Sequence, residues 1–326
     1  MNKIPVLKFV PQFKNVLWGG KRIAEYKGMP FQGDHIGESW ELSGVPGYES
    51  VISEGPFKGK NLHEIMLSYG KEILGARLFA KYGSDFPLLI KVIDSNDDLS
   101  IQVHPDDRLA AERHHCSGKT ELWICVDPQP DAYLYTGFNT VLTKEDYIES
   151  IRNKAIVGKL RKCYTHKGDV FFLPAGRVHS IGKGNLLIEI QQTSDISYRI
   201  YDYDRRDAEG NPRQLHVEES LAAVNFGDVD NCCKPYRIKG EPDREETIAD
   251  CAYFTTTSVN VCNGLSLDLS SRDSFTILIV SSGEACVTDP DGTETKVPQG
   301  SAVLVPASMR KISVKGNCNI ITTYIR

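Results

Sequence analysis

Polar side chains that can bind a metal alternate with apolar ones along residues 100–104. Ser100, Gln102 and His104 are the polar members. In a strand, side chains two residues apart point to one face, so we expect these three to project together. Pro105 then ends the strand, because proline has no N–H to donate to a neighbouring strand.

Two later segments complete a mixed set of nitrogen and oxygen donors. A strand predicted over residues 120–126 carries Glu121, and a Pro-Ala-Gly turn at 174–176 precedes His179. Two imidazoles, one carboxylate and one amide oxygen suit a divalent first-row metal, zinc first. A single histidine after a strand is more often a hydrogen-bonded polar residue, so the Gln-x-His pair alone leaves ligand and structural roles equally open.

Three motifs decide between these roles by their order, spacing and identity. They are Gln-Val-His-Pro-Asp at 102–106, Gly-Lys-Thr-Glu-Leu-Trp at 118–123 and Leu-Pro-Ala-Gly-x-Val-His at 173–179. Together they resemble the type I mannose-6-phosphate isomerase family, in its short bacterial form. The resemblance covers residues 5–325, most strongly 86–125 and 168–205. It implies a zinc-dependent aldose–ketose isomerase that interconverts mannose 6-phosphate and fructose 6-phosphate through a cis-enediol. It also implies one zinc ion per chain, bound by Gln102, His104, Glu121 and His179.

The same resemblance implies roles for charged residues near the metal. Arg199 matches the family's active-site arginine, whose permanent charge can stabilise an enediolate. Glu189 is the candidate carboxylate base. Lys119 would share a face with Glu121, two residues on, and is the other candidate for proton transfer. We expect Lys119 rather to bind substrate or its phosphate, for which Ser100 is the second candidate.

The residues of this centre also admit roles outside isomerase catalysis. Arg199 has aspartates nearby at 195, 202 and 204, and could be a structural ion-pair partner. The metal could serve a sugar-binding cupin without catalysis, or an oxygenase on the same barrel. The usual cupin site contains more histidines, which disfavours the oxygenase. A binding protein would not need Arg199 and Lys119 to converge on the metal.

The elements that position these residues indicate a mainly β chain with some α structure. The resemblance implies two cupin-type jelly-roll barrels and a small helical portion. Residues 86–94 are apolar on both faces and predict a buried strand, in which Lys91 must find a carboxylate or a polar cavity. Helices are predicted over 61–82 and 143–153, with Asn61 and Thr143 as N-caps.

The domain organisation follows from a charged segment with Pro and Gly at 227–250. We place a boundary there, between a catalytic cupin domain with helical insertions (1–235) and a C-terminal cupin-like β domain (236–326). Residues 299–307 repeat the pattern of 167–175, so the second domain resembles a copy of the first. All eight histidines lie at or before residue 216, so no metal site of this kind is expected in the second domain.

Composition sets the remaining expectations. A net charge of −5 over 326 residues argues against a nucleic-acid partner and leaves room for a small phosphorylated sugar. No apolar run reaches about 18 residues, and the first residues lack the apolar segment typical of a signal peptide, so we expect no membrane partner. Nine cysteines without a Cys-x-x-Cys pair predict reduced thiols and a cytoplasmic enzyme. The oligomeric state is not predicted.

Overall fold

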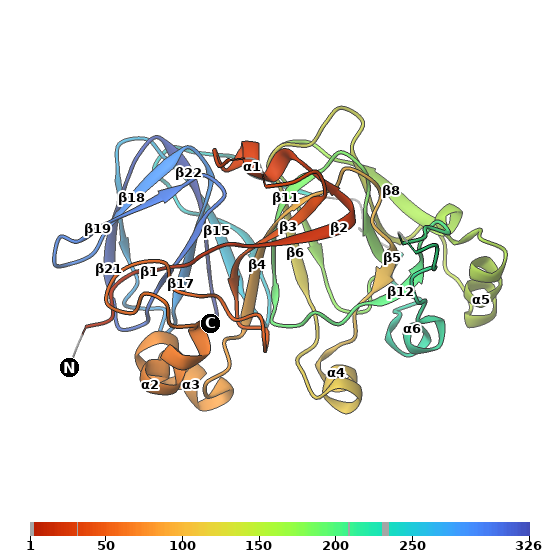
Figure 1. Cartoon of the computed structure of the whole chain (residues 1–326), viewed down its shortest axis with the longest axis horizontal. Coiled ribbons are helices and arrows are strands. Elements are labelled where there is room, and N and C mark those ends of the chain that lie inside the picture. Colours follow the sequence, from red (N-terminus) through yellow and green to blue (C-terminus); the bar gives the residue numbers. More distant parts are fainter. Residues whose placement is uncertain (1–2, 31, 208, 230–234) are drawn as a thin grey trace.

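A computed structural model describes residues 3–30, 32–207, 209–229 and 235–326. These residues form four antiparallel β-sheets with short helices around them (Figure 1). The prediction of a mainly β chain with some α structure is therefore confirmed. Within the described residues, all four sheets are open at their edges, and the two jelly-roll barrels stay a prediction.

Two sheets make up the part of the molecule that contains the motifs. The seven-stranded sheet has the order β13-β9-β6-β11-β4-β3-β2, that is Tyr236–Arg237, Asp169–Leu173, Glu121–Cys125, Leu186–Gln192, Leu88–Asp94, Ile36–Ser43 and Gln12–Gly20. The five-stranded sheet has the order β12-β5-β10-β7-β8, that is Tyr198–Tyr201, Ile101–Val103, His179–Ile181, Tyr133–Phe138 and Leu160–Tyr164. Buried side chains from both sheets, among them Trp123 and Ile181, pack together between them.

The other two sheets lie in the C-terminal part. The six-stranded sheet has the order β1-β20-β17-β22-β15-β14, that is Leu7–Lys8, Ala302–Val305, Thr276–Ser282, Cys318–Tyr324, Thr255–Val261 and Glu246–Asp250. The four-stranded sheet has the order β16-β21-β18-β19, that is Leu265–Asp268, Lys311–Lys315, Glu284–Thr288 and Glu294–Pro298. Strand β1 pairs with β20, so the start of the chain forms an edge of a C-terminal sheet.

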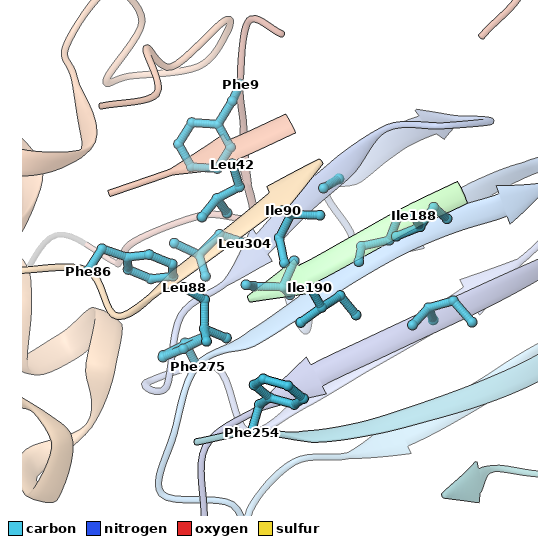
Figure 2. Packing of buried hydrophobic residues seen from close by; sticks show 14 of the residues in the cluster. Phe9, Leu42, Phe86, Leu88, Ile90, Ile188, Ile190, Phe254, Phe275 and Leu304 are labelled. Atoms are coloured by element: carbon cyan, nitrogen blue, oxygen red, sulfur yellow. The ribbon is translucent and has the colours of Figure 1, made fainter. Parts of the chain in front are cut away.

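The seven- and six-stranded sheets pack face to face around a shared apolar core (Figure 2). On β11, Ile188 and Ile190 point into this core, where Leu304 of β20 also lies. Leu187 belongs to the core on the opposite face, and Glu189 alternates to that same side. Burying each such isoleucine contributes roughly 1.5–3 kcal/mol. Because both faces of the sheet are covered, its central strands are mainly apolar, with a few buried polar residues such as Asp94, Glu189 and Gln191.

In the described parts of the chain, six α-helices and one 3-10 helix surround the sheets: α1 Arg22–Tyr26, α2 Leu62–Leu74, α3 Ala76–Tyr82, α4 Asp107–His114, α5 Lys144–Arg152, η1 Ile156–Lys159 and α6 Val217–Ala223. The predicted caps at Asn61 and Thr143 are confirmed, each as a reciprocal capping box. The helix predicted over 61–82 is corrected to two helices. Gly75 separates them at φ +89°, where a Cβ would lie 2.6 Å from the Asp273 carbonyl oxygen.

Two findings bear on the expectations drawn from composition. Among the residues described, no helix is long and apolar enough to cross a membrane. Six cysteines are free, at positions 116, 125, 251, 262, 286 and 318. Cys163 is disulfide-bonded, which corrects the expectation of a reduced thiol there. Cys232 and Cys233 lie outside the described residues.

Candidate metal centre

The five-stranded sheet aligns three of the predicted site residues across adjacent strands. His179 of β10 and Arg199 of β12 both lie opposite Gln102 of β5 in the antiparallel register. Residues directly opposite each other in antiparallel strands project from the same face. His104 follows β5 immediately and lies two residues from Gln102, so its side chain shares that face.

The seven-stranded sheet supplies the carboxylate from the facing layer. Glu121 opens β6, and its Oε1 lies 3.3 Å from His104 Nε2. Its Oε2 lies 3.5 Å from His179 Nε2, and the two imidazole Nε2 atoms are 3.1 Å apart. Donors about 2.0–2.2 Å from a tetrahedral zinc ion are about 3.4 Å from one another, so this spacing fits a bound metal. The side-chain amide of Gln102 lies 3.5 Å from His179 Nε2, and rotating that amide directs its oxygen to the same point.

Backbone carbonyls orient both imidazoles. His104 Nδ1 donates to the Ile196 carbonyl at 3.1 Å, and His179 Nδ1 donates to the Arg177 carbonyl at 2.8 Å. A proton on Nδ1 leaves the Nε2 lone pair free for a metal. Burial and the Lys119 charge lower the pKa of His104 to about 3, and burial lowers the pKa of His179. Both rings are therefore neutral at pH 7, as ligands must be.

Glu121 is ionised although it is fully buried. Burial alone would raise its pKa, but the Lys119 ammonium, 2.8 Å away, holds that pKa well below its usual value. Its buried Oε2 accepts no hydrogen bond from the described residues. An ionised carboxylate oxygen without a donor is costly in the interior, and a divalent cation at this point would remove the cost. The residues present therefore fit a metal.

A second group of charges lies beside the centre. Trp123 donates its indole N–H to Glu189 Oε2 at 2.8 Å, and Lys91 lies 3.1 Å from Glu189 Oε1 and 3.6 Å from Glu38. The expectation that Lys91 would find a carboxylate is confirmed. Burial and the nearby charge of Glu121 raise the pKa of Glu189, although Lys91 opposes this.

A cavity of about 300 Å³ opens onto these residues. Five of the eight predicted site residues line it: Ser100, Gln102, Lys119, Glu189 and Arg199. The other three, His104, Glu121 and His179, form the cluster described above, which Gln102 and Lys119 join to the cavity. Sequence and structure therefore bring all eight to one place.

The cavity is also lined by residues that were not predicted from the sequence to belong to the site. Arg213 and Asp195 also line the cavity, and neither was a predicted site residue. Arg213 follows β12 in an irregular segment, where no alternation indicates a direction. Trp40 lines the cavity as well, and its indole N–H donates to Glu38 at 2.6 Å.

Among the residues that the structure describes, Arg199 forms no ion pair with the aspartates near it in sequence. Its Nη1 donates to the Gln214 carbonyl at 2.8 Å, and its buried Nε has no partner among the described residues. Asp202 is instead bound by Arg205 and Arg213.

Comparisons with known proteins give a consistent result. Residues 6–143 match the family model for the phosphomannose isomerase type I catalytic domain, and residues 244–325 match that for the mannose-6-phosphate isomerase cupin domain. The mannose-6-phosphate isomerase ManA of Bacillus subtilis is 33% identical over 321 residues, which cover 98% of each chain.

Solved structures agree with the sequence comparison. The crystal structure of the Bacillus subtilis mannose 6-phosphate isomerase superposes with a TM-score of 0.85 at 30% identity, covering 98% of this chain and 99% of that one. A zinc-bound mannose 6-phosphate isomerase superposes with a TM-score of 0.78, covering 98% of this chain and 99% of that one. Because the two sequences are only 16% identical, this second similarity shows a shared fold.

Proposed function

Since the chain belongs to the type I phosphomannose isomerase family, its reaction is the interconversion of mannose 6-phosphate and fructose 6-phosphate, and we propose that zinc at His104, Glu121, His179 and Gln102 serves this reaction. The observation that carries the proposal is the convergence of two imidazole Nε2 atoms and the Glu121 carboxylate, whose contacts with one another are 3.1–3.5 Å. The described part of the chain contains one such cluster, which supports one ion per chain. The zinc-bound structure of similar fold supports zinc as the metal.

The reaction moves a proton between C2 and C1 of the open-chain sugar. A bound zinc ion supplies Lewis acidity that stabilises negative charge on the sugar oxygens. The chain itself must supply a proton carrier, a cation for the enediolate and contacts that orient the sugar.

We propose Glu189 as the proton carrier. It lines the cavity, and its raised pKa brings it closer to neutral pH, where a carboxylate exchanges protons most effectively. Trp123 contacts one of its oxygens and Lys91 the other, which restrains the carboxylate. Lys119, the other candidate, lies 2.8 Å from Glu121. This supports a position at the metal end of the cavity, where it keeps Glu121 ionised and can contact a sugar oxygen.

Arg199 and Ser100 complete the proposed substrate contacts. Arg199 is the cross-strand neighbour of Gln102, so its guanidinium can face charge that develops beside the metal. Ser100 immediately precedes β5, two residues before Gln102, and lines the same cavity, which suits a hydroxyl that donates to a sugar or phosphate oxygen.

For the architecture, we propose two cupin-type jelly-roll units, residues 1–235 and 236–326, with β1 added to a sheet of the second unit and β13 to a sheet of the first. Gly168 and Gly300 have φ of +84° and +71°, and each precedes an equivalent strand, β9 or β20. Pro174 and Pro306 follow those strands. This repeated turn–strand–proline pattern supports duplication of one unit.

A coupled assay on mannose 6-phosphate tests the proposed function. We expect turnover with mannose 6-phosphate and at least about 100-fold lower kcat/KM with free mannose, since the cavity is lined by several cations. Binding of mannose 6-phosphate without turnover would instead identify a sugar-binding protein.

A further inference from the structure

The cavity has a metal end and an opposite end, and the strand register distinguishes them. Strands β5 and β12 are antiparallel, with Gln102 opposite Arg199 and Ile101 opposite Tyr201. Moving from Gln102 to Ser100, a step of about 6.6 Å, therefore leads toward Asp202 and away from His104. The sugar's reacting carbons belong at the metal end, so its C6 phosphate extends toward the opposite end.

Two lysines that line the cavity are already paired with carboxylates. Lys119 lies 2.8 Å from Glu121, and Lys91 lies 3.1 Å from Glu189 and 3.6 Å from Glu38. Each ammonium is balanced by a buried carboxylate. The two pairs therefore offer little net positive charge to attract the phosphate dianion of the sugar. A phosphate needs cations whose donors are still available.

Arg213 offers such donors at the opposite end. Asp202 accepts from its Nε at 2.7 Å and from its Nη2 at 2.5 Å, so one edge of the guanidinium is clamped. Its Nη1 has no partner among the described residues, and the side chain lines the cavity. The clamp fixes the plane of the guanidinium and leaves its other edge for a ligand, which is the geometry of bidentate phosphate recognition.

The electrostatics of this end also favour an anion. Burial and the charge of Arg213 lower the pKa of Arg199, because two guanidinium groups lie near each other. Asp202 carries a single charge between Arg205 and Arg213. The third cavity carboxylate, Asp195, lies next to Ile196, whose carbonyl orients His104, and so belongs to the metal end.

We infer that Arg213 is the residue that binds the substrate's 6-phosphate and so sets specificity for phosphorylated sugars, with Asp202 as its positioning residue. The inference rests on the proposed function for the identity of the sugar. It assigns to Arg213 a role that no motif in the sequence indicated.

The test uses the full-length chain and the variants Arg213→Met and Arg213→Lys. Binding of inorganic phosphate, measured by calorimetry, is expected to weaken about 10- to 100-fold in Arg213→Met, the range for losing charge-assisted hydrogen bonds. The KM for mannose 6-phosphate should rise by a similar factor while kcat stays within about threefold, since the contact is made equally in ground and transition states. Arg213→Lys should fold like the wild type, and its phosphate affinity and KM should lie between those of the wild type and Arg213→Met.

Arg205→Met is the matched control. Arg205 binds the same Asp202 oxygen at 2.5 Å as Arg213 does, but it does not line the cavity. The Arg205→Met variant should keep the wild-type phosphate affinity and the wild-type KM for mannose 6-phosphate. An equal loss in Arg205→Met, or wild-type phosphate affinity in Arg213→Met and Arg213→Lys, would overturn the inference. If the wild type binds phosphate through Arg213 but does not isomerise the sugar, the proposed function fails and the phosphate site stands.

Discussion

Replacing Arg199 by alanine should lower kcat by roughly 10²–10³, with no change in zinc content. The guanidinium lines the cavity beside Gln102, and its buried Nε has no partner among the described residues. A fixed charge facing an enediolate acts on the transition state, and losing one such group costs about 2.7–4 kcal/mol in activation free energy. Because an arginine is not a metal ligand, the ion should remain bound.

The structure limits how much of this loss could come from unfolding. Within the described residues, the Arg199 side chain makes one hydrogen bond, from Nη1 to the Gln214 carbonyl, so the free energy of unfolding should fall by only about 0.5–1.5 kcal/mol. Arg199→Lys should restore little activity, because an ammonium does not occupy the positions of the planar guanidinium.

Arg161 provides a matched control for this experiment. It lies on β8, at the opposite edge of the same sheet, donates to the Val229 carbonyl at 3.2 Å, and also has a buried Nε without a partner among the described residues. Arg161→Ala should lose similar stability and keep its activity. The assay is kcat per zinc-loaded folded chain. A near wild-type kcat in Arg199→Ala would remove Arg199 from the active site.

Three further predictions follow from the metal centre. His104→Ala should lose both zinc and turnover, as measured by metal analysis and the coupled assay; full turnover without zinc would show that the metal has no role. Lys119→Met should lower kcat more than it raises KM, because Lys119 lies 2.8 Å from Glu121 at the metal end; a raised KM with unchanged kcat would place it on the phosphate instead. In the metal-free chain, burial lowers the pKa of His104 from 6.5 to about 3, so the unfolded chain binds more protons between these values. The resulting stabilisation is complete above about pH 6.5 and is lost as the pH falls toward 3. The free energy of unfolding in urea should therefore decrease more between about pH 7 and pH 5 in the wild type than in His104→Gln. Equal decreases in the two proteins would contradict a buried neutral imidazole.

The sequence was most informative where strand alternation and chemistry coincide. Ser100, Gln102 and His104 alternate with apolar residues, and Lys119 is two residues from Glu121, so their common faces could be predicted before their partners were known. The resemblance to a family then identified which distant segments, those of His179 and Arg199, meet them.

Features that depend on packing between distant segments could not be predicted. Gly75 splits a continuous helical pattern because the Asp273 backbone approaches it from the C-terminal part of the chain. Leu7–Lys8 joins a sheet whose strand β20 lies near the far end of the sequence. Arg213 lines the cavity while Asp202 holds its guanidinium, and its own segment has no periodicity from which a direction could be inferred.

Zinc removal and restoration, followed by the coupled assay on mannose 6-phosphate, measures whether the cluster of His104, Glu121, His179 and Gln102 is the catalytic centre. The chelated chain should be folded and inactive, and activity should return in proportion to added zinc until one ion per chain is bound. Full activity in the metal-free chain, or no recovery with zinc bound at this cluster, would contradict a zinc-dependent isomerase.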